Sequence, residues 1–108
     1  MITILLLLAL HAPEGYAMRH DVLLRARYTA VEGTDIEYGQ GAIERNDLRH
    51  RPLPHLEWLI LVEEPADPAA WQARLNDTVD PRHGTFTVER ASVEEEAAVR
   101  EGRIVMQK

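Results

Sequence analysis

The chain has 108 residues, of which 45% are hydrophobic and 28% are charged, as expected for a single globular domain. It contains no cysteine, which excludes disulfides, thiolate nucleophiles and cysteine-based metal sites. With 12 basic and 18 acidic residues the net charge is −6, and this argues against general nucleic-acid binding. The sequence therefore predicts one domain over residues 1–108, without nucleic acid as a partner.

The first ten residues are the most apolar stretch of the chain. Ile2–Leu10 carries no charge and only one polar side chain, Thr3. The absence of a basic residue before Arg19 and the poor cleavage site disfavour a secretory signal peptide. The run is also much shorter than the ~20 residues that span a bilayer. Because it does not alternate, we expect a central strand with two apolar faces, in a cytoplasmic protein that has no membrane partner.

Two patterns in the first half of the chain predict strands. Val22–Ala30 alternates with a period of two, which favours a half-exposed strand. Met18, Val22 and Ala26 lie four residues apart, so a helix stays open as the alternative for residues 13–27. Ile36–Tyr38 predicts a short strand that two following glycines interrupt.

The second half of the chain predicts alternating strands and helices. Leu56–Val62 is apolar on both faces and predicts a central strand. Asp67 before Pro68 is typical of a helix start, and Ser92 three residues before Glu95 matches a capping box. We expect helices over residues 68–76 and 93–101, and further strands over 85–91 and 104–106.

Together these elements predict an α+β fold with a mostly antiparallel sheet of five to six strands and two short helices on one face. Two helices can cover only one face of such a sheet. The apolar residues of the other face would then need a second copy of the chain or another protein partner. The expected interface residues are Ile4, Leu6, Leu8, Leu59 and Leu61.

The segment Arg45–His55 is the strongest candidate for binding. Two prolines exclude a helix and a central strand, so we expect an exposed loop. The loop is locally basic, whereas residues 89–101 contain five glutamates. It is expected to contact the acidic segment of another subunit or to hold an anionic ligand. The candidate contact residues are Arg45, Arg49, His50, Arg51 and His55.

Motifs for catalysis, cofactors and metals are weak. Gly39 and Gly41 lack the third glycine of a dinucleotide fingerprint, and they predict a bend. The histidines show no metal-ligand spacing, and no serine lies in a nucleophile elbow. We therefore expect no catalytic residue, metal or cofactor, although a buried acid such as Asp21 or Glu57 would escape detection by sequence.

The sequence thus favours a non-enzymatic structural or interaction module that self-associates, or assembles into a larger particle, through an apolar sheet face. The alternative is a small ligand-binding domain or enzyme that holds an anionic small molecule with its arginine-rich loop.

Overall fold

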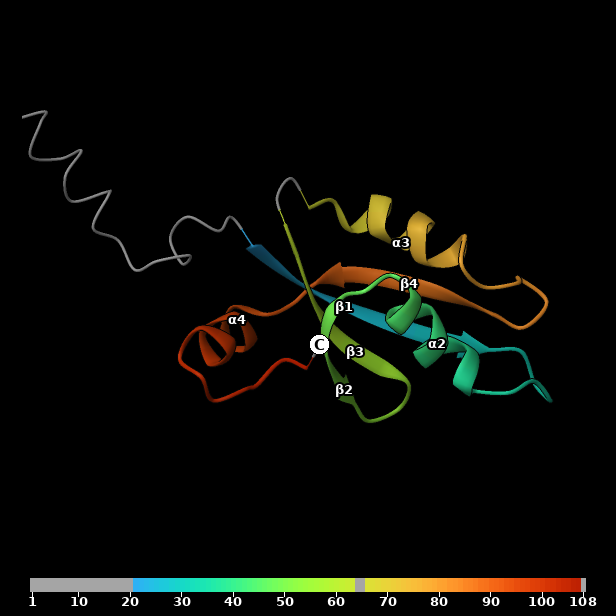
Figure 1. Ribbon diagram of the computed structural model, residues 1–108, viewed down its shortest axis with the longest axis horizontal. Coiled ribbons are helices and arrows are strands. Elements are labelled where there is room, and N and C mark those ends of the chain that lie inside the picture. Colours follow the sequence, from blue (N-terminus) through green and yellow to red (C-terminus); the bar gives the residue numbers. More distant parts are fainter. Residues whose placement is uncertain (1–20, 64–65, 108) are drawn as a thin grey trace, which may run out of the picture.

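The computed structural model describes residues 21–63 and 66–107 (Figure 1). The opening run Ile2–Leu10, including Ile4, Leu6 and Leu8, lies outside the described residues. Seven elements follow one another along the described chain: β1 (Asp21–Ala30), α2 (Glu37–Arg45), β2 (Arg49–Leu53), β3 (Glu57–Glu63), α3 (Pro68–Asn76), β4 (Gly84–Arg90) and α4 (Val93–Arg100).

The strands form one antiparallel sheet in the order β2-β3-β1-β4. Helix α2 connects β1 to β2 across β3, and α3 connects β3 to β4 across β1. The chain therefore consists of two interleaved split β-α-β units. The expected α+β fold with an antiparallel sheet is confirmed, but the described sheet has four strands rather than five to six.

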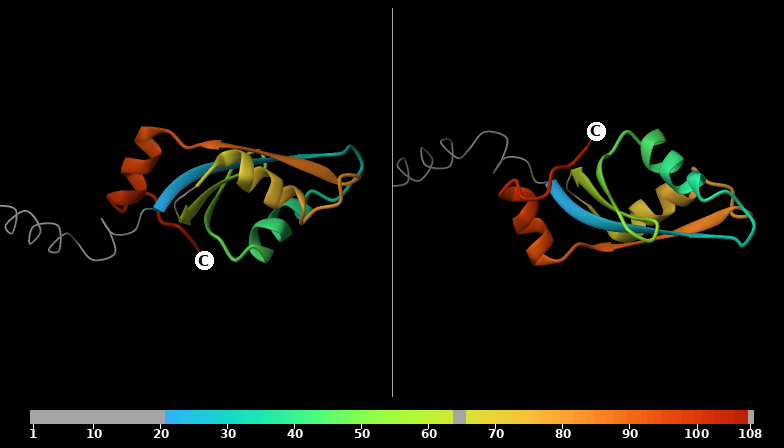
Figure 2. Two further views of the ribbon diagram at one scale, coloured as in Figure 1. Left: turned by 90° about the horizontal axis from the view of Figure 1, so that it is seen from above. Right: turned by 90° about the horizontal axis from the view of Figure 1, so that it is seen from below.

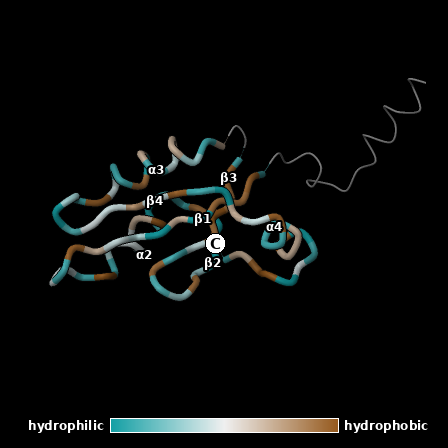
Figure 3. The backbone as a smooth tube through the Cα atoms, turned by 180° about the vertical axis from the view of Figure 1, so that it is seen from behind, coloured by the Kyte–Doolittle hydropathy of each residue, from teal (hydrophilic) through white to brown (hydrophobic). Residues whose placement is uncertain are grey.

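The first face of the sheet holds the larger hydrophobic core. The even-numbered residues of β1 and β3 point to this face, where the ring of Phe86 lies 5.0 Å from that of Tyr28 and 6.1 Å from that of Trp58. Ile43 of α2 and Leu75 of α3 close the core from above. The two helices lie together over this side of the sheet (Figure 2). Hydrophobic residues concentrate on the central strands, and the connections are largely hydrophilic (Figure 3).

Among the described residues, those that cover the second face lie at one end of it. Leu23 of β1 and Leu59 of β3 are buried there against Ala91 and Met106. Helix α4 and the C-terminal segment supply this cover at the end of the sheet where β1 begins (Figures 1 and 2). The expectation of two helices on one face is thus wrong, because the described chain has three helices and α4 packs opposite α2 and α3.

The expected strand Ile36–Tyr38 is also wrong, because Glu37 begins helix α2. Glycines weaken the local helix signal, but Gly39 has a packing function here. A Cβ atom at Gly39 would lie 2.8 Å from the ring of Tyr28 and 2.9 Å from that of Trp58. The glycine therefore lets α2 approach the sheet closely. This requirement arises from tertiary packing, so it cannot be predicted from sequence periodicity.

The segment Arg45–His55 is not a loop throughout, because β2 forms an edge strand within it. Pro52 fits there, since an edge strand does not need every N–H group. The strand expected over residues 104–106 is absent. Instead, Gln107 makes a single bridge to His50, with N–H···O distances of 2.8 Å and 2.6 Å.

Side chains of α3 close the opposite edge of the sheet. Asn76 accepts a hydrogen bond from the Phe86 N–H (2.7 Å) and donates one to the Phe86 carbonyl oxygen (3.3 Å). Gln72 Oε1 accepts a hydrogen bond from the Val88 N–H at 3.0 Å. These amides occupy backbone groups of β4 that would otherwise pair with another strand.

Both predicted helix starts are confirmed. The Asp67 side chain accepts a hydrogen bond from the Ala69 N–H at 3.1 Å, before Pro68. The Ser92 hydroxyl accepts from the Glu95 N–H at 3.1 Å, and the Glu95 carboxylate accepts from the Ser92 N–H at 3.0 Å. This reciprocal pair is a complete capping box for α4.

Candidate functional site

Arg49 and Arg51 lie on strand β2 with exposed side chains. They are two residues apart, so both point to the second face, opposite Leu61 and Leu59 in the register. Neither guanidinium makes an ion pair with a described residue. This edge of the sheet therefore presents two positive charges to solvent.

The other candidate contact residues of the segment lie elsewhere. Arg45 ends α2, and its guanidinium donates a hydrogen bond to the Thr78 carbonyl oxygen at 2.8 Å. His55 is exposed in the turn between β2 and β3, with a φ of +64°. His50 faces the first side of the sheet and is 5% exposed. The structure brings Arg49 and Arg51 together and separates them from Arg45 and His50.

The His50 side chain belongs to a series of hydrogen-bonded polar side chains. Its Nδ1 lies 2.8 Å from the Leu48 carbonyl oxygen, and because a carbonyl only accepts, Nδ1 carries the proton of this bond. Its Nε2 lies 3.5 Å from Nε2 of Gln40, whose Oε1 accepts the Trp58 indole N–H at 2.7 Å. The imidazole therefore joins β2 to α2 and offers no surface to a partner.

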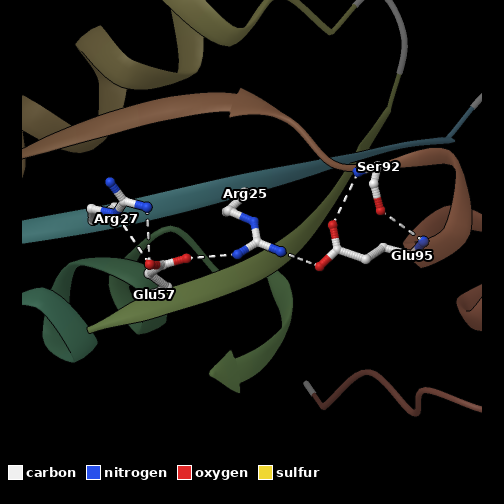
Figure 4. Close-up of polar contacts among 5 residues, drawn as sticks. All are labelled: Arg25, Arg27, Glu57, Ser92 and Glu95. Atoms are coloured by element: carbon white, nitrogen blue, oxygen red, sulfur yellow. Dashed lines mark hydrogen bonds and ion pairs between the residues drawn. The ribbon is translucent and has the colours of Figure 1, made fainter. Parts of the chain in front are cut away.

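An ion-pair network crosses the second face (Figure 4). Arg25 lies between two carboxylates: it donates to Glu57 at 2.7 Å and also pairs with Glu95 of α4. Arg27 approaches the other oxygen of Glu57 at 3.1 Å. The capping-box residue Glu95 thus also ties α4 to the sheet. The sequence predicts the box, but it does not indicate the pairing with Arg25.

The network shifts the pKa values of Glu57 and Arg25. The hydrogen bond from Arg25, aided by the charge of Arg27, lowers the pKa of Glu57 even though burial opposes this. The same hydrogen bond to Glu57, together with the charge of Glu95, raises the pKa of Arg25. Both shifts favour the charged forms of Arg25 and Glu57, so the ion pair between them is maintained at neutral pH.

The outer surface of α4 differs from this network. Val93 is 74% exposed at its first residue, and Val105 in the following segment is 64% exposed. Glu94 is exposed and Glu96 half-buried in the same first turn, and neither carboxylate makes an ion pair with a described residue. The helix presents negative charge beside exposed apolar surface.

The expected interface residues on β3 are covered by the chain itself. Leu59 is 0% exposed, and Leu61 is half-buried beside it. Both contact the cluster formed with α4 and the C-terminal segment. Leu59 therefore offers no area to a partner in this conformation, and the interface prediction stays a prediction.

A different group of titratable residues lies where β1 ends. Burial raises the pKa of the Tyr28 hydroxyl, with smaller contributions from Tyr38 and Asp35. The hydroxyl is buried and has no hydrogen-bond partner among the described residues. In the exposed turn before β4, Arg82 lowers the pKa of Asp80 to about 2 through side-chain and backbone hydrogen bonds.

Within residues 21–63 and 66–107, no group of three or more histidines and carboxylates is placed to hold a metal ion. None of the helices in this part of the chain is long and apolar enough to cross a membrane.

Comparison with known proteins gives no relative: no family model, no curated protein and no solved structure matches the chain. The geometry of the described surfaces is therefore the basis for a functional proposal.

Proposed function

We propose that the chain is a non-enzymatic interaction module that associates with a second copy of itself. In the proposed contact, Arg49 and Arg51 of one copy meet Glu94 and Glu96 of the other. The observation that carries this proposal is the imbalance of charge on the second side of the molecule. Arg25, Arg27, Glu57 and Glu95 neutralise one another there. The other charges on this side, Arg49 and Arg51 of β2 and Glu94 and Glu96 of α4, have no described ion-pair partner.

The apolar part of the second face is already occupied by α4 and the C-terminal segment. The proposed interface accordingly lies on the outer surface of these elements. Val93 adjoins Glu94, and Val105 is two residues from Gln107, which bridges to β2 beside Arg49. Two exposed valines would thus supply apolar contact within a rim of opposite charges, which is the usual arrangement of a small interface.

A two-fold arrangement makes each charge contact twice. In such a dimer the β2 arginines of one copy face the α4 glutamates of the other, and the reverse pairing follows from symmetry. Charges on an interface rim contribute mainly to orientation and association rate. We therefore expect reversible association that weakens as the salt concentration rises.

Charge reversal with a complementary rescue tests the proposal. Arg49→Glu with Arg51→Glu, and Glu94→Lys with Glu96→Lys, should each reduce the dimer fraction in sedimentation equilibrium. Mixing the two variants should restore dimers, because the reversed charges then attract. The control variant, Arg45→Glu with Arg74→Glu, changes the net charge by the same amount as Arg49→Glu with Arg51→Glu. Because its substitutions lie on other surfaces, it should leave association unchanged. An equal loss in this control, or no rescue on mixing, would contradict the proposed contact.

A further inference from the structure

An open cleft of about 490 Å³ lies between α3, the end of β3 and the segment before β2. None of the four charged residues of the proposed dimer contact is among the residues that line the cleft. Its apolar lining residues are Leu48, Leu61, Val62, Ala70 and Trp71. Its volume falls in the range of about 300–1,000 Å³ that is typical of small-molecule sites. The cleft can therefore hold a compact apolar group.

Two charged side chains also line the cleft, Arg74 and Glu63. The Arg74 guanidinium lies 4.6 Å from the centre of the Trp71 ring, a cation–π contact that orients it over the indole. No described carboxylate forms an ion pair with Arg74, and this includes Glu63. A fixed cation beside apolar surface suits one carboxylate attached to an apolar body.

We propose that this cleft binds a small apolar monocarboxylate. The carboxylate would accept hydrogen bonds from Arg74, and the apolar body would lie against Trp71, Leu48 and Val62. Glu63 adds selectivity, because its negative charge disfavours a ligand that carries a second carboxylate. The positive charge of Arg74 likewise disfavours an amine in the place of the carboxylate.

The two tryptophans of the chain allow a direct test on the full-length protein. Each indole N–H gives its own signal in a nitrogen–proton correlation spectrum. Trp71 lines the cleft, whereas Trp58 is 4% exposed and donates its N–H to Gln40, so it serves as an internal control. Hexanoate should shift the Trp71 signal saturably and leave the Trp58 signal in place. Adipate and hexylamine, which also have six carbons, should shift the Trp71 signal far less.

Arg74→Gln should weaken hexanoate binding about tenfold, since it removes a charge-assisted hydrogen-bond donor. Arg82→Gln removes the same charge in the exposed turn before β4, outside the cleft, and should leave binding unchanged. The proposal is overturned if hexanoate leaves the Trp71 signal unmoved, as it would if another segment or a protein filled the cleft. It is equally overturned if all three probes act alike, or if Arg74→Gln binds hexanoate as the wild type does.

Discussion

The two faces of the sheet use the same central strands in different ways. Under α2 and α3, the first face buries Tyr28, Trp58 and Phe86 in a continuous apolar core. The second face has a smaller apolar cluster at one end, next to the Arg25–Glu57 ion pair. The difference indicates that the first face supplies most of the stability. The second face and the elements that cover it leave charged side chains exposed to solvent.

Adjacent leucines on β1 test this difference with one chemical change. Leu24 is 0% exposed on the first face, and Leu23 is 2% exposed on the second. Leu24→Ala should lower the free energy of unfolding by about 3–5 kcal/mol, and Leu23→Ala by about 2–3 kcal/mol, because the smaller cluster can collapse around the cavity. Urea unfolding measures both losses. A larger loss for Leu23→Ala would reverse the ranking of the two faces.

The ion-pair network should contribute less than Leu24 and no more than Leu23. Glu57→Gln should lower the free energy of unfolding by about 1–3 kcal/mol at pH 7, since it removes a carboxylate that bonds Arg25 in a half-buried position. The exposed partner of Arg103, Glu101, provides the control, and Glu101→Gln should have little effect.

The loss of stability in Glu57→Gln should depend on pH, because the pKa of Glu57 is lowered in the folded state. The stabilisation is complete above the ordinary glutamate value of 4.5, and it disappears as the pH falls through the lower pKa of the folded state. The difference between wild type and Glu57→Gln should therefore shrink as the pH falls below 4.5. A difference that stays constant on acidification would show that the network does not depend on this charge.

Asn76→Ala tests how the β4 edge is closed. The substitution removes both hydrogen bonds to Phe86, so the free energy of unfolding should fall by about 1–2 kcal/mol. The exposed edge should also favour strand pairing between molecules, which light scattering would detect. Asp77→Ala, the neighbouring exposed position, is the control. Equal stability and light scattering in both variants would show that Asn76 does not protect the β4 edge.

Tyr28→Phe should have the smallest effect, and in the opposite direction. The buried Tyr28 hydroxyl has no hydrogen-bond partner among the described residues, so its removal should stabilise the fold by about 1 kcal/mol at pH 7. Because the pKa of Tyr28 is raised, wild-type stability falls as the pH rises above the ordinary value of 10, where the unfolded tyrosine ionises. The advantage of the variant should therefore grow above pH 10, and unfolding measured at neutral and alkaline pH checks this. Loss of stability at pH 7 would show that the hydroxyl has a partner.

The elements with local signals are the ones that sequence could predict. The alternation before Ala30, the apolar run at Leu56–Val62 and the caps at Asp67 and Ser92 all correspond to described elements. Helix α2 escapes prediction because the reason for Gly39 is its contact with two rings from distant strands.

Sequence reasoning also missed the centre of the charged network. Arg25 pairs with Glu57, which lies 32 residues away, and with Glu95, which lies 70 residues away. Only the strand register and the position of α4 bring these side chains together. The exposure of Arg49 and Arg51 could be expected from their charge. Their separation from Arg45 depends on β2, whose strand character was hidden by the prolines.

The mass of the wild-type protein in solution tests the central claim of self-association most directly. Sedimentation equilibrium should be run at about 0.1 mM, well above the micromolar Kd of a modest interface. At low salt we expect a dimer, with twice the 12.3 kDa of the chain, and dissociation as salt is added. A strict monomer of 12.3 kDa at every salt concentration would contradict the account.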